Sequence, residues 1–245
     1  MRIVKSSVAF AFILIPALAL AQKSDYKEGH VFGATVYVGP GSFADALSWS
    51  HYYGIGKRKR LNVGYGLRLT NFFGSDQDYL TAPAKYTSGK SSLAALFTET
   101  INENIDTINF ASTQTNSLNL GIYVKYILPL WKNRIELGLN IDAIGFTAGA
   151  SQKGQYRNAV VAAKPTAFNL LLISDSDIGS LNSEWYVGVS VNKKLTVRAG
   201  YEFLFTEFTT SSKVQQIPDT NEFNDRFRLK SSMILLGIAY MPFRK

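Results

Sequence analysis

The chain has 245 residues, which is enough for one domain, and it contains no cysteine. Hydrogen bonds and packing must therefore hold the fold, because disulfides and thiol-bound metal are excluded. The formal net charge is +8. The basic residues are spread over several short segments instead of one recognition element, which disfavours nucleic-acid binding.

The N-terminal segment has the three parts of a secretory signal peptide. Arg2 and Lys5 give a positive start, residues 8–20 are apolar, and Ala19 and Ala21 are the small residues that cleavage requires. The apolar run is short for a transmembrane helix. We expect residues 1–21 to be removed and residues 22–245 to form the exported domain. No later apolar stretch suits a spanning helix, so entry into a membrane would require a closed sheet.

Beyond this segment, apolar and polar residues alternate over stretches of about ten positions. Within residues 61–73, for example, Leu67 and Leu69 alternate with Arg68 and Thr70. Successive side chains of a strand point to opposite faces, so such a stretch has one apolar and one polar side. We expect eight strands, at residues 31–38, 46–55, 61–73, 116–127, 135–147, 184–191, 195–208 and 228–243.

The connections between these strands alternate in length. The short ones are residues 56–60, 129–134 and 192–194, and the long ones are residues 39–45, 74–112, 148–182 and 209–225. Short turns on one side and long loops on the other are typical of a bacterial outer-membrane barrel, whereas long loops disfavour a compact soluble domain. An even strand count also places both termini on the periplasmic side.

The charges follow the same two-sided pattern. The short turns, together with Arg244 and Lys245, carry ten basic residues and no acidic residue, whereas the long loops carry eleven acidic and six basic residues. A basic rim attracts anionic lipid head groups. Solvation of turns by lysine and arginine explains the rim equally well, and both interpretations remain open.

The polar face of the strands carries charged residues that would point into the barrel. The predicted network consists of Arg68, Lys125, Glu136, Asp142, Arg198 and Glu202. Position along the strands predicts a lower layer of Lys125, Glu136 and Arg198, and an upper layer of Arg68, Asp142 and Glu202. A small barrel has room for little more than its own side chains, and buried charges must be paired. The equal number of acids and bases favours a plug over a polar conduit or a titrating gate.

Small and aromatic residues follow the same alternation. The inward positions include Gly64, Gly66, Gly121, Gly138, Gly188 and Gly200, as a narrow lumen requires. Trp49, Phe73, Trp185 and Phe205 lie near strand ends on the apolar face, where an interfacial aromatic girdle is expected.

Taken together, the strand pattern, the loop asymmetry and the terminal strand at residues 231–243 resemble the small outer-membrane barrels of the OmpA, OmpX and OmpW type. The terminal strand is also similar to that of small barrels of the Bacteroidota. The resemblance implies an all-β, eight-stranded antiparallel transmembrane barrel in the outer membrane, without a cofactor. Members of the class usually end on an aromatic residue, whereas here Arg244 and Lys245 follow Phe243.

Some barrels of this size are lipid-modifying enzymes, and their chemistry needs a histidine near a serine or an acid. The chain has two histidines. We expect His30 to precede the first strand and His51 to face outward among aromatic residues, where a catalytic base would be poorly placed. No histidine pair suitable for a metal site is evident.

Two loop segments, residues 91–97 and 158–173, are too apolar for free exposure to solvent. Their apolar members include Leu93, Leu96, Phe97, Phe168, Leu170, Leu171 and Leu172. They would dock a partner protein, cap the barrel, admit an apolar solute, or pack on each other.

The leading hypothesis is a non-enzymatic outer-membrane barrel with a charge-plugged lumen and surface loops that recognise a partner or the surroundings. A passive channel for small hydrophobic molecules is the second hypothesis, and a lipid-modifying enzyme is the third. Outer-membrane lipids are the expected partners, and the sequence leaves the oligomeric state open.

Overall fold

The computed structural model describes residues 29–82, 105–132, 134–172, 177–217 and 221–242. The predicted signal peptide lies outside these ranges, as do three residues of the predicted apolar loop patch, Leu93, Leu96 and Phe97. No helix in the described ranges is long and apolar enough to cross a membrane.

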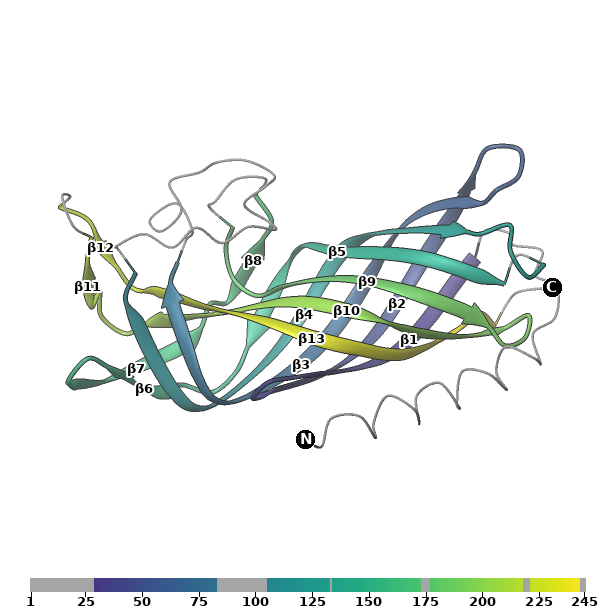
Figure 1. Ribbon diagram of the computed structural model, residues 1–245. Helices are drawn as coiled ribbons and strands as arrows, with labels where there is room; N and C mark the ends of the chain where they lie inside the picture. Colours follow the sequence, from purple (N-terminus) through teal and green to yellow (C-terminus); the bar gives the residue numbers. More distant parts are fainter. Residues whose placement is uncertain (1–28, 83–104, 133, 173–176, 218–220, 243–245) are drawn as a thin grey trace, which may run out of the picture.

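Eight long antiparallel strands close into a barrel, which confirms the predicted fold class (Figure 1). They are β1 (Gly29–Gly39), β2 (Ser42–Ile55), β3 (Leu61–Thr81), β4 (Thr107–Ile127), β5 (Ile135–Ala148), β9 (Leu181–Ser190), β10 (Leu195–Thr210) and β13 (Arg226–Tyr240). Each strand pairs with the next in this order, and β13 pairs with β1 to complete the ring.

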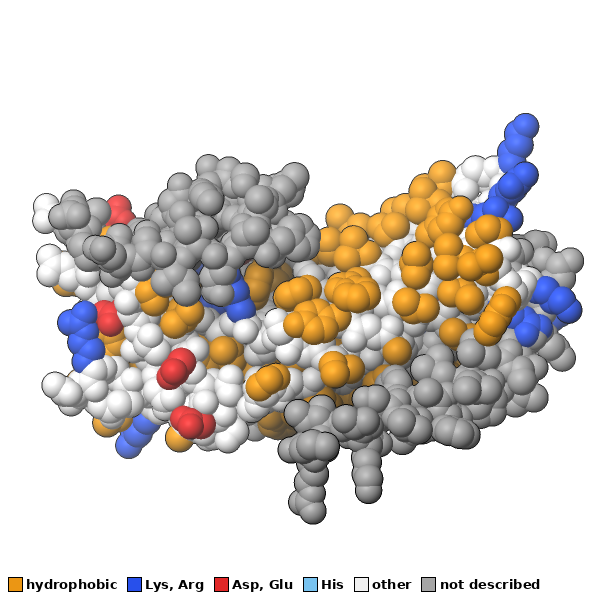
Figure 2. All heavy atoms as spheres, viewed as in Figure 1, with side chains coloured by type: hydrophobic (Ala, Val, Ile, Leu, Met, Phe, Trp, Pro, Cys, Tyr) orange, Lys and Arg blue, Asp and Glu red, His pale blue; other side chains and the backbone are white. Residues whose placement is uncertain are grey.

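The alternation in the sequence becomes an outer apolar face and an inner polar face. Leu120 and Leu139 are 43% and 44% exposed, whereas Lys125 and Asp142 are 0% and 1% exposed. Figure 2 shows hydrophobic side chains covering much of the wall toward the end that carries the short turns. We call this outer surface the apolar belt. Basic side chains stand at both ends in this view, whereas the visible acidic side chains all lie toward the end away from the short turns.

The connection between β1 and β2 is a tight turn, so the predicted loop at residues 39–45 is wrong. Gly39 pairs directly with Ser42, which leaves two residues in the turn. Proline followed by Gly41, whose φ is +59°, suits a type II turn. The strand pattern was obscured because Asp45 faces outward, where its carboxylate accepts a hydrogen bond of 2.7 Å from the Asn71 amide.

In the residues that the structure describes, the other long connections also contain strands, which corrects parts of the predicted loops at residues 74–112, 148–182 and 209–225. β3 and β4 continue well beyond their predicted limits. The shorter strands are β6 (Gln152–Tyr156), β7 (Ala159–Pro165), β8 (Phe168–Leu170), β11 (Gln215–Gln216) and β12 (Phe223–Asn224).

These extensions close a second, six-stranded ring that continues the barrel at the end away from the three short turns. β6 pairs with the extended β4, β7 pairs with β10, and β13 pairs directly with β3 at Phe227 and Arg228. The ring therefore runs β3, β4, β6, β7, β10 and β13, at the left in Figure 1. We call this part of the molecule the extension end, and the side of the three short turns the turn end.

A β-bulge in β5 reverses the facing of its last residues. The β4–β5 register shifts between Leu120 and Gly121, so that Ala143 has no directly opposite partner. Beyond it Ile144 and Phe146 face outward, at 40% and 65% exposure. Bulges redirect side chains in this way, and here Asp142 is directed into the lumen immediately before the shift.

Candidate functional site: the closed lumen

A lower layer of charges crosses the lumen near the turn end. Glu136 of β5 lies between two bases, with Oε2 3.7 Å from Lys125 Nζ and Oε1 3.6 Å from Arg198 Nη2. Lys125 Nζ lies 4.0 Å from the centre of the Tyr52 ring, and the Arg198 guanidinium also lies over a tyrosine ring. The structure thus brings together the three residues predicted for this layer.

The upper layer is centred on Arg68 of β3. Its Nη2 and Nε atoms lie 2.7 and 3.1 Å from Asp142 Oδ1, and its Nη1 lies 3.0 Å from Glu184 Oε2. The second oxygen of Asp142 accepts hydrogen bonds from Asn119 Nδ2 at 2.8 Å and from the Asn182 backbone amide at 3.2 Å. One guanidinium of β3 therefore joins two carboxylates that come from the neighbouring strands β5 and β9.

Glu202, the third residue predicted for this layer, takes a different role. Among the described residues it forms no ion pair within 4.0 Å, and it accepts a hydrogen bond from the Asn182 side chain. Glu184 occupies the expected place beside Arg68. It also accepts a hydrogen bond of 2.8 Å from Tyr37 and another from Asn140.

Glu184 was missed, although the sequence carried the signal. It directly precedes Trp185, which faces outward, so strand alternation places Glu184 inward. With Glu184 included, Glu136, Asp142, Glu184 and Glu202 stand against three buried bases of the lumen. The predicted equality of acids and bases is therefore wrong.

An apolar cluster fills part of the lumen beside the charged layers, and the Tyr186 ring in it lies against the Arg198 guanidinium of the lower layer. Its side chains come from β1, β2, β3, β9, β10 and β13, and they are Tyr37, Ala44, Ala46, Phe72, Tyr186, Leu204, Met233 and Leu235. We call this cluster the central compartment. Tyr37 contributes its ring to the compartment and its hydroxyl to Glu184, so it joins the two regions.

An aromatic cluster fills the six-stranded ring at the extension end. Its members are Tyr79, Ile108, Phe110, Tyr156, Ala163, Phe208 and Phe227. The Phe110 ring centre lies 5.1 Å from that of Tyr79 and 5.0 Å from that of Phe208. Burial raises the pKa of Tyr79 to about 12, although its hydroxyl is within hydrogen-bonding distance of Thr113 and Thr206. We call this cluster the aromatic cap.

A second ion cluster lies on the outer side of the β10–β13 wall. Both Arg226 and Arg228 bind Glu207, with nitrogen–oxygen distances of 2.8 Å. Burial alone would raise the pKa of Glu207, but the two guanidinium groups outweigh it and lower that pKa. Both arginines also donate to the Asp177 carbonyl, and the Gly179 amide donates to Glu207 at 3.3 Å. The cluster therefore fastens the segment after β8 against the wall.

The second apolar loop segment is incorporated into the sheet. The Phe168 ring lies 5.7 Å from that of Phe146 on the outer face, and Leu170 forms a bridge with Ile178. The Leu171 amide donates to the Ala143 carbonyl at the bulge, and the Leu172 amide donates to Asp177. Within the described part of the segment, the residues thus extend the wall beside β5.

Both histidines lie on the outer face near the turn end. His30 lies within β1, not before it as predicted, and it pairs across the strands with His51. Their ring centres are 4.6 Å apart, and the rings of Trp49, Tyr53 and Tyr65 surround them. The described residues contain no group of three or more histidines, cysteines or acids that is arranged to hold a metal ion.

Comparisons with known proteins identify no family. No protein-family model matches the chain, and no curated protein matches it. Among solved structures, Neisserial surface protein A aligns over 86% of this chain and 93% of its own, with 8% identity and a TM-score of 0.34. The toluene transporter TbuX of Ralstonia pickettii aligns over 82% of this chain and 68% of its own, with 10% identity and a TM-score of 0.22.

Proposed function

We propose that the chain is a non-enzymatic outer-membrane barrel with a closed lumen, which acts through its extension end. The observation that carries the proposal is the presence of three fillings inside one barrel. Ion-paired side chains and the central compartment occupy the eight-stranded ring, and the aromatic cap fills the six-stranded ring at the extension end. A barrel filled in this way serves as a scaffold for what it exposes at its surface.

The outer membrane is the environment that the wall favours. The outward residues of all eight strands form the apolar belt, which suits lipid and is costly in water. The basic turns then face the periplasm. The extension end faces outward, and its paired strands give it a defined surface for recognising a partner or the cell surroundings. Catalysis is disfavoured because His51 lies among aromatic rings on the outer face.

Single-channel recording of the purified protein in planar bilayers tests the closed lumen. We expect no reproducible conductance from the full chain. A reproducible conductance of the parent protein that changes in an Arg68→Ser variant would overturn the proposal. Arg68 lies inside the lumen, so its substitution would not alter the conductance of a contaminating porin. The matched surface variant Lys57→Ser is expected to behave as the parent does.

A passive channel for small hydrophobic molecules is the second candidate, and the apolar lining of the central compartment favours it. Proteoliposomes containing the chain would then accumulate an apolar fluorescent probe faster than empty vesicles. Met233→Trp would slow that uptake by adding bulk to the central compartment. Equal uptake with and without the protein would reject the channel and leave the closed barrel in place.

A further inference from the structure

The barrel wall has a break in its strand pairing above the β1–β2 turn. β13 pairs with β1 from Ile234 onward, and it pairs with β3 at Phe227 and Arg228. In the described part of the chain, no ladder pairing joins residues 229–233 of β13 to β3. The strand edges separate here because the β1–β2 hairpin ends at the tight turn after Gly39, below the six-stranded ring.

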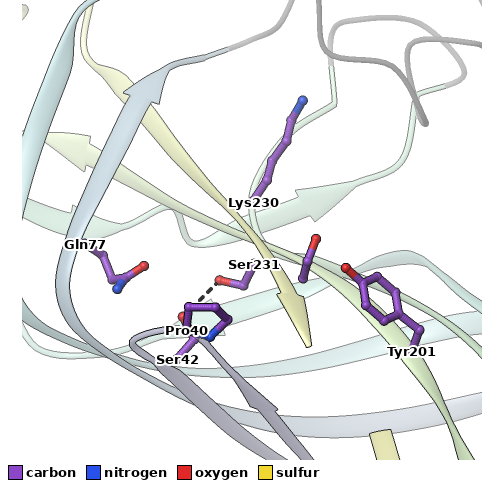
Figure 3. Close-up of a pocket in the computed structure, with 7 residues that line it drawn as sticks. Pro40, Ser42, Gln77, Tyr201, Lys230 and Ser231 are labelled. Atoms are coloured by element: carbon purple, nitrogen blue, oxygen red, sulfur yellow. Dashed lines mark hydrogen bonds between the residues drawn. The ribbon is translucent and has the colours of Figure 1, made fainter. Parts of the chain in front are cut away.

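A hollow of about 420 Å³ occupies this break, which is a volume typical of ligand sites (Figure 3). Its lining consists of Pro40, Ser42, Gln77, Tyr201, Lys230, Ser231 and Ser232. On the inner side, the buried hydroxyls of Ser42 and Ser231 lie 3.3 Å apart. The outer side presents the Lys230 ammonium group and the Tyr201 hydroxyl. Hydroxyls, an amide and a lysine side chain thus line one small space, and the Lys230 side chain extends away from the two serines at its outer edge (Figure 3).

The hollow lies where the apolar belt ends. Below it on the outer wall are Ile234 and Phe203, at 60% and 39% exposure, and the Tyr201 ring, which contacts that of Phe203. Above it on β13, Arg228 and Arg226 face the same side as Lys230. Lys230 is exposed, and its Nζ lies 5.8 Å from the centre of the Phe205 ring. In a membrane, this border is the height of the lipid head groups.

We propose that the hollow binds the phosphate group of a phosphorylated outer-leaflet lipid, whose acyl chains then lie along Ile234 and Phe203. The ammonium group of Lys230 supplies the charge for the phosphate, and the serine and tyrosine hydroxyls supply hydrogen-bond donors. Glu207 offsets one of the two arginines above, so the region remains positive. A lipid fits better than a soluble anion because the polar hollow opens directly onto the apolar belt. This inference rests on the proposed outer-membrane location.

The test is titration of the purified full chain in detergent with bis-phosphorylated lipid A, read by native mass spectrometry. One lysine near an anionic head group contributes about 1 kcal/mol, or about fivefold in affinity. We therefore expect Lys230→Ala to bind the lipid about fivefold more weakly than the parent. Lys153→Ala removes an exposed lysine of β6 outside the hollow, and we expect it to bind as the parent does. Equal weakening in both variants would overturn the proposal.

Two further arms separate the sources of the phosphate. The parent should bind dephosphorylated lipid A more weakly than it binds the phosphorylated form. With dephosphorylated lipid A, the parent and Lys230→Ala should have the same affinity. Inorganic phosphate at the same concentration should leave the lipid bound. If inorganic phosphate displaced the lipid, the hollow would be a site for a soluble anion, and the proposal would be rejected. Cell fractionation tests the membrane location separately, so a failed titration of a chain found in the outer membrane rejects this site alone.

Discussion

Individual buried charges decide how firmly the lumen is held. Arg68 is 1% exposed and joins Asp142 and Glu184, whereas Arg157 at the surface is 71% exposed and binds Asp106 at the same distance of 2.7 Å. Removing one partner of a buried pair leaves uncompensated charge, whereas exposed pairs contribute little. Burial, and not distance, therefore separates the two pairs.

We predict that Arg68→Met lowers the free energy of unfolding by about 3–5 kcal/mol, because it leaves the buried carboxylates of Asp142 and Glu184 without their shared base. Urea unfolding in detergent, followed by tryptophan fluorescence, measures the change. The matched variant Arg157→Met should unfold close to the parent. Similar midpoints for both variants would show that the upper layer does not hold the barrel.

At the residue scale, strand alternation predicts most of the lumen. Arg68, Lys125 and Asp142 point inward because their neighbours Leu67, Tyr126 and Ile141 belong to the apolar face. Alternation does not predict which residues touch, because the tilt of the strands sets the height of each side chain. Glu202 consequently lies against Asn182, and Glu184 takes its expected position beside Arg68.

At the scale of elements, the alternation of apolar and polar residues predicts a strand only where one face of that strand belongs to the apolar belt. Residues 74–81 and 107–115 continue β3 and β4 into the extension end, where no apolar outer face is required and the alternation of large apolar residues stops. The sequence did not predict β6, β7 or the Glu207 cluster for the same reason, because they also lie where no apolar outer face is required. Glu207 has outward parity, and it is buried because the segment at residues 177–180 folds over it.

The Glu207 cluster should control how tightly that segment is held. We predict that Glu207→Gln increases hydrogen exchange at residues 178–180 by about tenfold, since charge-assisted hydrogen bonds contribute about 1.5–3 kcal/mol. Mass spectrometry of the peptide containing these residues measures the change. Asp76→Asn, which alters an exposed acid of β3 bound to Asn109, is the matched control and should leave this exchange unaltered.

The difference in hydrogen exchange between the parent and Glu207→Gln should depend on pH. The folded pKa of Glu207 is lowered from 4.5, so its stabilising contribution is present above the unfolded pKa and is lost as the pH falls through the folded pKa. The difference in exchange between the parent and Glu207→Gln should therefore shrink as the pH falls below about 4.5. A difference that stays constant down to pH 2 would contradict the assigned role of the carboxylate.

At the scale of the whole molecule, the two ends of the barrel differ in both construction and charge. The turn end consists of short basic connections, such as that from Lys57 to Arg60, whereas the extension end is a second ring closed by the aromatic cap. Sequence reasoning predicted the closed cylinder because the apolar belt constrains every strand. It did not predict the second ring, since pairing between the extensions depends on backbone hydrogen bonds that leave little trace in hydropathy.

This asymmetry predicts the orientation of the chain in the cell. The protein contains no cysteine, so single cysteines give a clean background for labelling. Asn158→Cys lies in the exposed turn between β6 and β7, and Lys57→Cys lies in the exposed turn between β2 and β3. A membrane-impermeant maleimide should label Asn158→Cys on intact cells. Lys57→Cys should react after the outer membrane is opened. Equal labelling of both positions on intact cells, or the reverse order, would contradict the proposed placement, because the apolar belt would then not separate two compartments in the predicted sense.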